Sequence, residues 1–331
     1  MSFDLEETTK NYLKFRNVLV KKVADSQEIG RSEYWRQESE QFEYLFDASP
    51  SLLRNLRQHC VLITGIRSYE YFDHHKISAS FTNLEKRLQE LRALDPDLPV
   101  LSERLELGGF GFEYDGQKFN IDTLKFHEMH LALKKLGVLD FKQSEQFRGR
   151  VVEIGGGWGG FAETFLRRFP NAKYTIVDLP EVLIFSSTFL STWYPDKKLH
   201  IFGTESTEED LCDADILLIS NSDATSLPKS IQFELMINSV SFQEMTSKQV
   251  REYISFGMER SCRSFYSLNR DRSNYNTEIS SVREIMSEHL RIKEVEILET
   301  DYAGALKTKK KLNKLKESAD SNRYRHVLGV R

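Results

Sequence analysis

Five glycines stand within six consecutive positions, directly after a short apolar run. They are Gly155, Gly156, Gly157, Gly159 and Gly160. Glycine lets the backbone turn tightly and lets a ligand approach closely, and the N–H groups at the start of a following helix can face that ligand. Gly155, Gly157 and Gly160 also satisfy G-x-G-x-x-G, a pattern typical of dinucleotide-binding folds. The run therefore predicts a pocket for a nucleotide-type cofactor where a strand turns into a helix.

A carboxylate beside this turn distinguishes two kinds of cofactor. Glu153 lies two positions before Gly155, where its charge would repel the pyrophosphate of a dinucleotide and attract the ammonium group of S-adenosylmethionine (SAM). We therefore favour SAM, and an NAD(P)-dependent oxidoreductase is the alternative. Glu153 has a structural interpretation as well, as a carboxylate that caps the turn.

A second acid supports the pocket without identifying its cofactor. Asp178 ends the next strand-like run, 23 positions after Gly155, where a carboxylate can accept hydrogen bonds from a ribose diol. That spacing fits either cofactor. Because Pro180 follows closely, Asp178 could also be the N-cap of the next helix, and both roles can coexist.

Three segments resemble the class I SAM-dependent O-methyltransferases: VEIGGGWGG (152–160), RFP (168–170) and VDLPEV (177–182). Two later segments, FELMINSVSFQEM (233–245) and FYSLNR (265–270), resemble most closely the putative sugar O-methyltransferase family. The resemblance covers about residues 120–270. It implies a Rossmann-like sheet, SAM as the cofactor and methyl transfer to a hydroxyl. The cofactor contacts that it implies are Glu153, Gly155, Gly157, Trp158, Asp178, Leu179, Ser222 and Asp223. Ser222 and Asp223 depend on which run forms the third strand of the sheet, residues 199–202 or 216–220. The run 216–220 matches the methyltransferase pattern better, and these two residues follow it.

The first three segments are in particular similar to a branch that includes plant and bacterial phenol O-methyltransferases. The sequence departs from these phenol-modifying relatives at the catalytic base. Gln243 stands where those enzymes carry a His, and an amide cannot accept a proton at neutral pH. The phenol mechanism therefore does not carry over, which favours a sugar hydroxyl as the acceptor. Glu244, which follows the fourth strand, is our first candidate for the base, and an ion pair or a helix cap is an equal alternative. A phenolic acceptor and a non-catalytic SAM-fold protein also stay open.

A histidine is the second candidate for the base. His130 lies at the edge of the apolar stripe of a predicted helix, where a satisfied core residue is the favoured interpretation. The adjacent His74 and His75 resemble a metal patch, but neighbouring residues on a helix point about 100° apart. We expect no metal site.

The elements that must position these residues change character near residue 148. Helical periodicity dominates before it, including a helix around residues 34–46 that Pro50 ends and a helix with Asp122 as its N-cap. Strand-like runs alternate with helices after it, which predicts an α/β fold with crossover helices. We expect a mainly helical N-terminal domain (1–120) that shapes the acceptor pocket, a connecting helix region (121–147) and a Rossmann-like methyltransferase domain (148–331).

Composition excludes several classes of protein. The 331 residues include 46 Lys and Arg against 50 Asp and Glu, so general binding to nucleic acid is not expected. The three cysteines are widely spaced, which suits a reducing compartment. No signal peptide or membrane-spanning run is visible. We expect a cytoplasmic enzyme that acts on a small molecule, and a homodimer stays open. Six lysines at 307–316 are interpreted as a solvated run.

Overall fold

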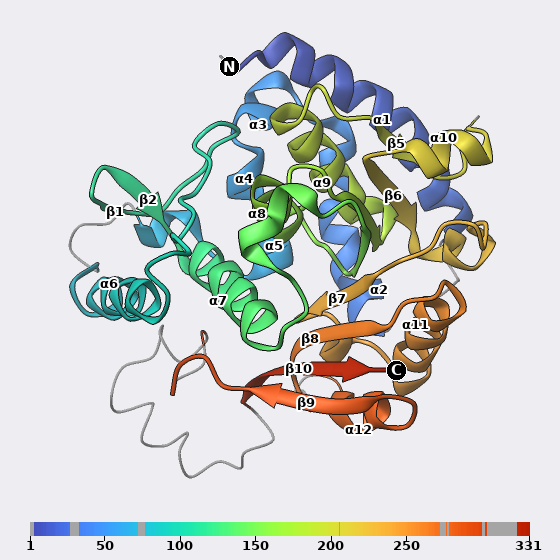
Figure 1. The fold of residues 1–331 in the computed structure, drawn as a ribbon. Coiled ribbons are helices and arrows are strands. Elements are labelled where there is room, and N and C mark those ends of the chain that lie inside the picture. The colour runs from blue at the N-terminus through green and yellow to red at the C-terminus, as the bar shows by residue number, and fades with distance from the viewer. Residues whose placement is uncertain are drawn as a thin grey trace.

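An eight-stranded, mostly parallel sheet forms the centre of the protein (Figure 1). The computed structural model describes residues 3–26, 33–71, 77–204, 206–271, 276, 278–299, 302 and 323–331. The strands of this sheet are β3 (Arg150–Ile154), β4 (Lys173–Asp178), β5 (Leu199–Ile201), β6 (Ile216–Ser220), β7 (Leu235–Ser239), β8 (Ser264–Arg270), β9 (Arg291–Val295) and β10 (Tyr324–Val330). The strands stand in the order β5-β6-β4-β3-β7-β8-β10-β9.

The strand order confirms the Rossmann-like class I methyltransferase sheet that the motifs predict. From β6 to β9 the order is that of the class I sheet, with β10 antiparallel to both β8 and β9, and β5 adds one strand at the edge. The chain leaves β3 for β4 on one side and later returns to β7 on the other side. Ligands of open α/β sheets bind at such a switch point, beyond the carboxyl ends of the strands.

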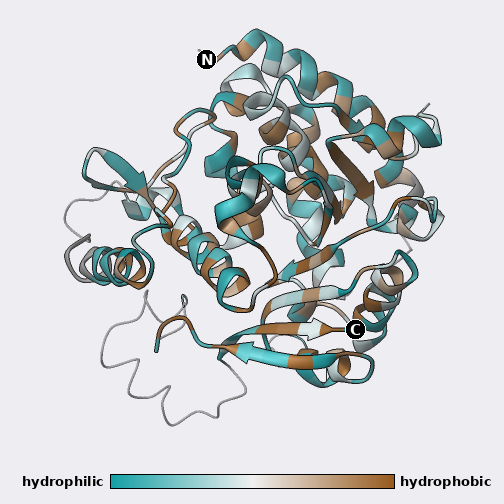
Figure 2. Cartoon of the chain, viewed as in Figure 1, coloured by the Kyte–Doolittle hydropathy of each residue, from teal (hydrophilic) through white to brown (hydrophobic). Residues whose placement is uncertain are grey.

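Burial explains why these segments form strands. Every residue of β3 and of β6 is buried, as expected for parallel strands that are covered on both faces and are rich in Val, Ile and Leu. By contrast, β9 lies at an edge and carries Arg291, Lys293 and Glu294, and Figure 2 shows it as largely hydrophilic. Charged side chains on an edge strand discourage pairing with another chain.

Helices cover both faces of the sheet. One face packs against α1, α7, α8 and α9 in a core that includes Phe161, Phe165 and Leu183. The other face packs against α10, α11 and α12 in a second core that includes Val250, Ile254 and Ile285. The longer helices are α1 (Leu5–Ser26), α6 (Ile77–Leu94), α7 (Ile121–Lys135), α8 (Gly160–Arg168), α9 (Pro180–Trp193) and α11 (Ser247–Glu259). The shorter ones are α2 (Glu33–Ser39), α3 (Pro50–Arg54), α4 (Leu56–His59), α5 (Val61–Thr64), α10 (Glu208–Asp213) and α12 (Val282–Ser287). The 3-10 helices are η1 (Glu40–Asp47), η2 (Ser68–Tyr71), η3 (Phe141–Gln146), η4 (Asn221–Ser226) and η5 (Phe242–Glu244). A two-stranded hairpin, β1 (Phe112–Tyr114) and β2 (Gln117–Phe119), lies apart from the sheet.

The N-terminal helices share their hydrophobic core with the sheet. Helix α1 lies along α9, and its Tyr12 hydroxyl donates a 2.6 Å hydrogen bond to the carbonyl of Leu45. Lys22 at the other end of α1 forms an ion pair with Asp223, which follows β6. The residues predicted to form an N-terminal domain therefore pack against α9 and against the segment that follows β6.

Two local predictions are wrong. Asn120, not Asp122, is the N-cap of α7, and its side chain accepts a 3.0 Å hydrogen bond from the Thr123 N–H in a capping box. The predicted helix around residues 34–46 divides into α2 and η1. Pro50 is the first residue of a new helix, α3, where its missing N–H costs nothing.

Asp122 instead belongs to a buried charged cluster. The Arg57 guanidinium lies 2.8 Å from both Glu103 and Asp122, and all three side chains are almost fully buried. Burial alone would raise the pKa of Asp122, but Lys125 and Arg57 hold it below its ordinary value. The cluster connects α4 to the start of α7.

Arg57→Met is expected to lower the free energy of unfolding by about 3–5 kcal/mol, because it leaves two buried carboxylates without their shared cation. Urea unfolding measures the change. Arg251→Met is the matched control, because it removes an exposed pair with Glu288 and should cost no more than about 1 kcal/mol. Equal losses in the two variants would contradict a stabilising role for the buried cluster.

Candidate active site

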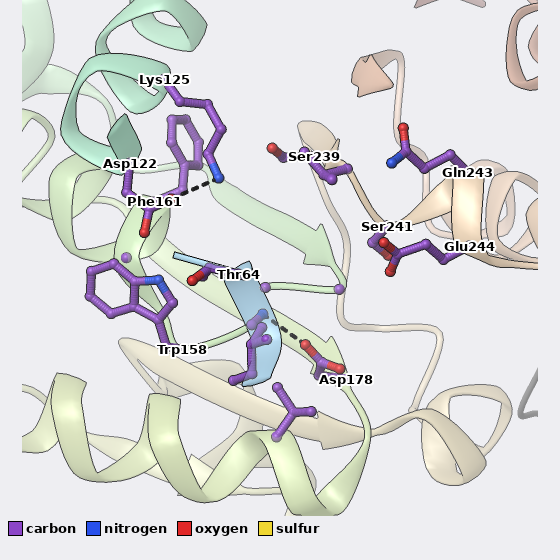
Figure 3. A pocket seen from close by; sticks show the side chains of 18 of the residues that line it. Thr64, Asp122, Lys125, Trp158, Phe161, Asp178, Ser239, Ser241, Gln243 and Glu244 are labelled. Atoms are coloured by element: carbon purple, nitrogen blue, oxygen red, sulfur yellow. Dashed lines mark hydrogen bonds and ion pairs between the residues drawn. The ribbon is translucent and has the colours of Figure 1, made fainter. Parts of the chain in front are cut away.

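A cavity of about 650 Å³ opens where β3, β4 and β7 end. Its lining combines the glycine turn with the loop after β7 and with residues of the N-terminal helices. In Figure 3, Thr64 of α5 lies in the same cavity as Trp158 and Asp178, while Gln243 and Glu244 lie on another side. Segments that are far apart in the sequence therefore build one pocket at the switch point of the sheet.

The glycine turn forms a cradle without side chains. Gly155 and Gly157 have φ values of 70° and 57°, in the left-handed region that favours glycine. A Cβ atom on Gly155 would lie 2.1 Å from the Ser241 hydroxyl oxygen, so the turn itself requires glycine there. A Cβ atom on Gly157 would lie 3.2 Å from Ile63 Cγ2, closer than an ordinary van der Waals contact. The Ile63 side chain therefore packs close to the turn, and both line the cavity.

Asp178 connects this turn to the end of β4. Its Oδ2 accepts a 2.7 Å hydrogen bond from the Gly157 N–H, and its Oδ1 accepts one of the same length from the Leu179 N–H. Burial raises the pKa of Asp178 to about 7, although the two N–H groups lower it. The N-cap of α9 is Leu179, so Asp178 does not cap that helix. Each carboxylate oxygen of the ionised group can still accept a hydrogen bond from a hydroxyl.

Glu153 is a buried carboxylate that lines the cavity with little positive charge near it. Its Oε2 accepts a 3.0 Å hydrogen bond from the Tyr174 hydroxyl, and only 2% of the residue is exposed. Burial raises the pKa of Glu153 to about 8, and the influence of Lys125 lowers it only slightly. A cationic group placed in the cavity would therefore stabilise the ionised form of Glu153.

The strand beside β4 is β6, so 216–220 takes the place of the third strand. Asn221, directly after β6, lines the cavity. Ser222 and Asp223 are not brought to it. The Ser222 hydroxyl lies 2.8 Å from that of Ser220, and Asp223 pairs with Lys22. Trp158 and Leu179, by contrast, are both part of the lining.

The two candidate residues in η5, Gln243 and Glu244, differ in how fully their side chains are already held by other hydrogen bonds. Gln243 is buried, and both ends of its amide are engaged: Oε1 accepts a 3.0 Å hydrogen bond from the Arg270 N–H, and Nε2 donates one of 3.3 Å to the Tyr324 hydroxyl. Gln243 therefore holds the loop after β7 against β8 and β10. Glu244 lines the cavity, and burial raises its pKa to about 8, although a hydrogen bond with Trp35 lowers it.

His130 lies in the hydrophobic core and is not part of the cavity lining. Its ring stacks on Phe161 at 5.0 Å, and its Nε2 lies 3.2 Å from the Thr164 hydroxyl. Burial holds the pKa of His130 well below its ordinary value, so the ring is neutral. Its position matches the structural interpretation of this residue and not the catalytic one.

Several residues of the cavity wall were not predicted. Asp122 and Lys125, 3.0 Å apart on α7, both line it (Figure 3). Arg57 lies behind them with its guanidinium 3.9 Å from the centre of the Trp158 ring. The spacing of Asp122 and Lys125 places them on one face of a helix, which is a signal that could have indicated the pair. Nothing in the sequence marks Arg57 as different from other arginines.

Among the residues that the structure describes, no group of three His, Cys, Asp or Glu side chains could hold a metal ion. His74, His75 and the lysine run at 307–316 lie outside the described residues. Within the described part of the chain, no helix is both long and apolar enough to cross a membrane.

Part of the chain is similar to proteins of known family. The profile of the O-methyltransferase domain matches residues 100–222. A stretch of 71 residues is 32% identical to acetylserotonin O-methyltransferase 1 of Oryza sativa subsp. japonica, and it covers 21% of this chain and 18% of that protein. Residues 100–222 are therefore similar to the O-methyltransferase domain, and they form part of the class I methyltransferase sheet.

Solved structures of low sequence identity also align with the chain. An O-methyltransferase family protein from Burkholderia thailandensis aligns over 98% of this chain and 95% of its own, with 12% identity and a TM-score of 0.38. Human N-acetylserotonin methyltransferase in complex with SAM aligns over 87% of this chain and 69% of its own, with 14% identity and a TM-score of 0.35.

Proposed function

We propose that the protein is a SAM-dependent O-methyltransferase acting on a hydroxyl of a small molecule, a proposal supported by the similarity of residues 100–222 to the O-methyltransferase domain. The observation that supports this most is the arrangement of Glu153 and Asp178 at the ends of adjoining strands, beside a glycine turn without side chains. A cofactor with a cationic amino-acid end and a ribose fits this arrangement better than one with a pyrophosphate.

The residues present fit SAM at each of its parts. Glu153 would receive the ammonium group, and Lys125, whose charge reaches Glu153, would pair with the carboxylate. Asp178 would accept hydrogen bonds from the ribose hydroxyls, and Leu179 and Asn221 would contact the adenine. When bound, SAM supplies an electrophilic methyl group. The chain must hold the acceptor hydroxyl in line with that group and remove its proton.

We assign to Glu244 the role of the general base that removes the proton of the acceptor hydroxyl. It lines the cavity beyond the end of β7, and its pKa of about 8 lies close to neutral pH, where a general base is most effective. Gln243, with both ends of its amide engaged, would keep the loop of Glu244 in place. His130 is buried away from the cavity and takes no part in this proposal.

For the acceptor we propose a small hydroxylated metabolite without restricting it to sugars. One relative has a name that gives acetylserotonin as its acceptor, and aromatic side chains such as Phe126, Tyr302 and Tyr324 line the cavity. A carbohydrate acceptor is the second candidate. It is favoured by the resemblance of 233–245 and 265–270 to the sugar family, and by Gln243 in place of a catalytic His.

Thermal unfolding with added S-adenosylhomocysteine (SAH), SAM, NAD or NADP tests the cofactor. SAM and SAH should stabilise the protein by a few kcal/mol at saturation, and the dinucleotides should not. Stabilisation by NAD or NADP alone would contradict the proposal. Methyl transfer from labelled SAM to phenols, sugars and nucleotide sugars then tests the acceptor, and SAH binding without turnover of any of them would favour a non-catalytic protein.

The affinity for SAM is expected to rise with pH between 6 and 7.5. The folded protein holds protons on Glu153 and Asp178 because their pKa values are raised to about 8 and about 7. Binding to the cationic ligand requires the ionised carboxylate, so each pH unit below 8 costs up to about tenfold in affinity through Glu153. Calorimetric titration measures this slope. Glu153→Gln should weaken binding and flatten the slope, and an unchanged slope in that variant would assign the titration to another group.

A further inference from the structure

We propose that Arg270 receives a negatively charged group of the acceptor, so that the substrate is a hydroxylated carboxylate or phosphate and not a neutral alcohol. This inference rests on the proposed methyltransferase function and names the substrate class for the same cavity. It is carried by the position of Arg270, by its surroundings and by the absence of an ion pair between Arg270 and the described residues.

Arg270 is held in the wall of the cavity at the end of β8. Its backbone N–H donates to Gln243 Oε1, and the residue pairs with Tyr324 across β8 and β10. Its guanidinium lies 4.5 Å from the centre of the Tyr324 ring, and that ring lies 4.6 Å from Tyr302. Stacking on an aromatic face leaves the in-plane N–H groups of a guanidinium available to a ligand.

Two other cations at or behind this wall, Lys125 and Arg57, form close ion pairs, whereas Arg270 forms none with the described residues. Lys125 pairs with Asp122 at 3.0 Å, and Arg57 pairs with Glu103 and Asp122. Arg270 forms no ion pair with any residue that the structure describes, and its buried Nε has no hydrogen-bond partner among those residues. Leaving a buried donor unsatisfied is costly, and an anionic ligand would provide the missing acceptor.

The location of Arg270 separates it from the cofactor residues. Glu153 is on β3, and β7 stands between β3 and β8, so Arg270 lies two strand spacings away, roughly 10 Å along the sheet. Glu244 follows β7, the strand between them. A small acceptor that is anchored by Arg270 would therefore extend over the end of β7 toward Glu244 and the cofactor.

The guanidinium group also indicates the chemistry of the ligand. Its N–H groups form a planar fork that matches two oxygens of a carboxylate or a phosphate. Near this fork the cavity presents the neutral groups of Gln243, Asn276, Tyr302 and Tyr324. It also presents Glu244, whose pKa burial raises to about 8, although the charge of Arg270 lowers it. A neutral hydroxyl would satisfy the fork less well, because charge-assisted hydrogen bonds are about twice as strong as neutral ones.

Matched pairs of acceptors test the inference with the full-length protein saturated with SAH. The pairs are catechol with 3,4-dihydroxybenzoate, glucose with glucuronate, and glucose with glucose 6-phosphate. Calorimetry measures binding, and labelled SAM measures turnover. We expect the anionic member of at least one pair to bind roughly 10- to 100-fold more tightly than its neutral partner, and the preferred pair distinguishes a carboxylate from a phosphate.

Arg270→Gln should remove this preference and leave the affinity for SAH unchanged, and Arg270→Lys should restore part of it. Arg291→Gln, on the exposed edge strand β9, is the control and should behave as the wild type. Equal binding of neutral and anionic members, no binding of any member, an unchanged preference in Arg270→Gln, or a loss of SAH affinity in that variant would each overturn the inference. Failure of the wild-type protein to bind SAH would overturn the proposed function and the inference with it.

Discussion

Gly157→Val is expected to abolish SAH binding in a protein that still folds. Valine at φ 57° is strained, and its Cβ atom alone would already crowd Ile63 at 3.2 Å. Gly157 and Ile63 both line the cavity, so the added side chain would obstruct a cofactor that lies against the turn. Calorimetric titration measures the binding, and circular dichroism reports the fold.

Gly137→Val separates backbone strain from obstruction of the cavity. Gly137 has a φ of 71°, and nothing lies within 4 Å of the position of its Cβ atom. The strain should therefore be similar, roughly 1–2 kcal/mol, while SAH binding stays intact. If Gly157→Val binds SAH as the wild type does, the cofactor does not lie on the glycine turn.

Glu244→Gln is expected to lower kcat by roughly 10²–10⁴-fold with little change in the affinity for SAH. Glutamine keeps the size and hydrogen-bonding capacity of the side chain but cannot remove the proton from the hydroxyl that is methylated. Because burial raises the pKa of Glu244 to about 8, the base form increases as pH rises through 8. In the wild type kcat/KM should rise over that range and then level off, and the variant should lose this dependence.

Glu252→Gln, at an exposed position of α11, is the matched control and should leave both kcat and its pH dependence unchanged. Full activity of Glu244→Gln would remove Glu244 from the reaction. A loss of SAH affinity in Glu244→Gln equal to the loss of rate would show that Glu244 supports cofactor binding instead.

The part of the site that could be predicted from the sequence is the part made by consecutive residues. The glycine turn, Glu153 and Asp178 lie within 30 positions, and each is adjacent to a strand whose apolar run is easily recognised. The Rossmann-like sheet was implied by the same motifs, because they resemble a family with that sheet. Ser222 and Asp223 were expected to contact the cofactor, but they lie in η4 outside the cavity lining, whereas Asn221 just before them lines it.

The rest of the site depends on contacts between distant segments. Arg57, Glu103 and Asp122 meet only because α4, an irregular loop and α7 pack together, and no periodicity in the sequence reports that packing. The wrong prediction of Asp122 as an N-cap has the same cause. Its residue type suits a cap, but the Asn120 side chain accepts the hydrogen bond from the Thr123 N–H, and Asp122 pairs with Arg57 instead. For His130, both interpretations were available from the helix pattern, and only the position of Phe161 distinguishes them.

The N-terminal wall of the cavity has a consequence for the speed of the catalytic cycle. Residues 61–66 and 70–71 line the cavity. They belong to α5 and η2, which are helices of four residues each, and to the linker between them. Helices this short retain few internal hydrogen bonds, so this wall opens at a lower free-energy cost than the buried strands opposite it. Exchange of spent cofactor for fresh cofactor would pass through the 61–71 segment, and changes in its stability would alter the rate of product release before they alter the chemical step.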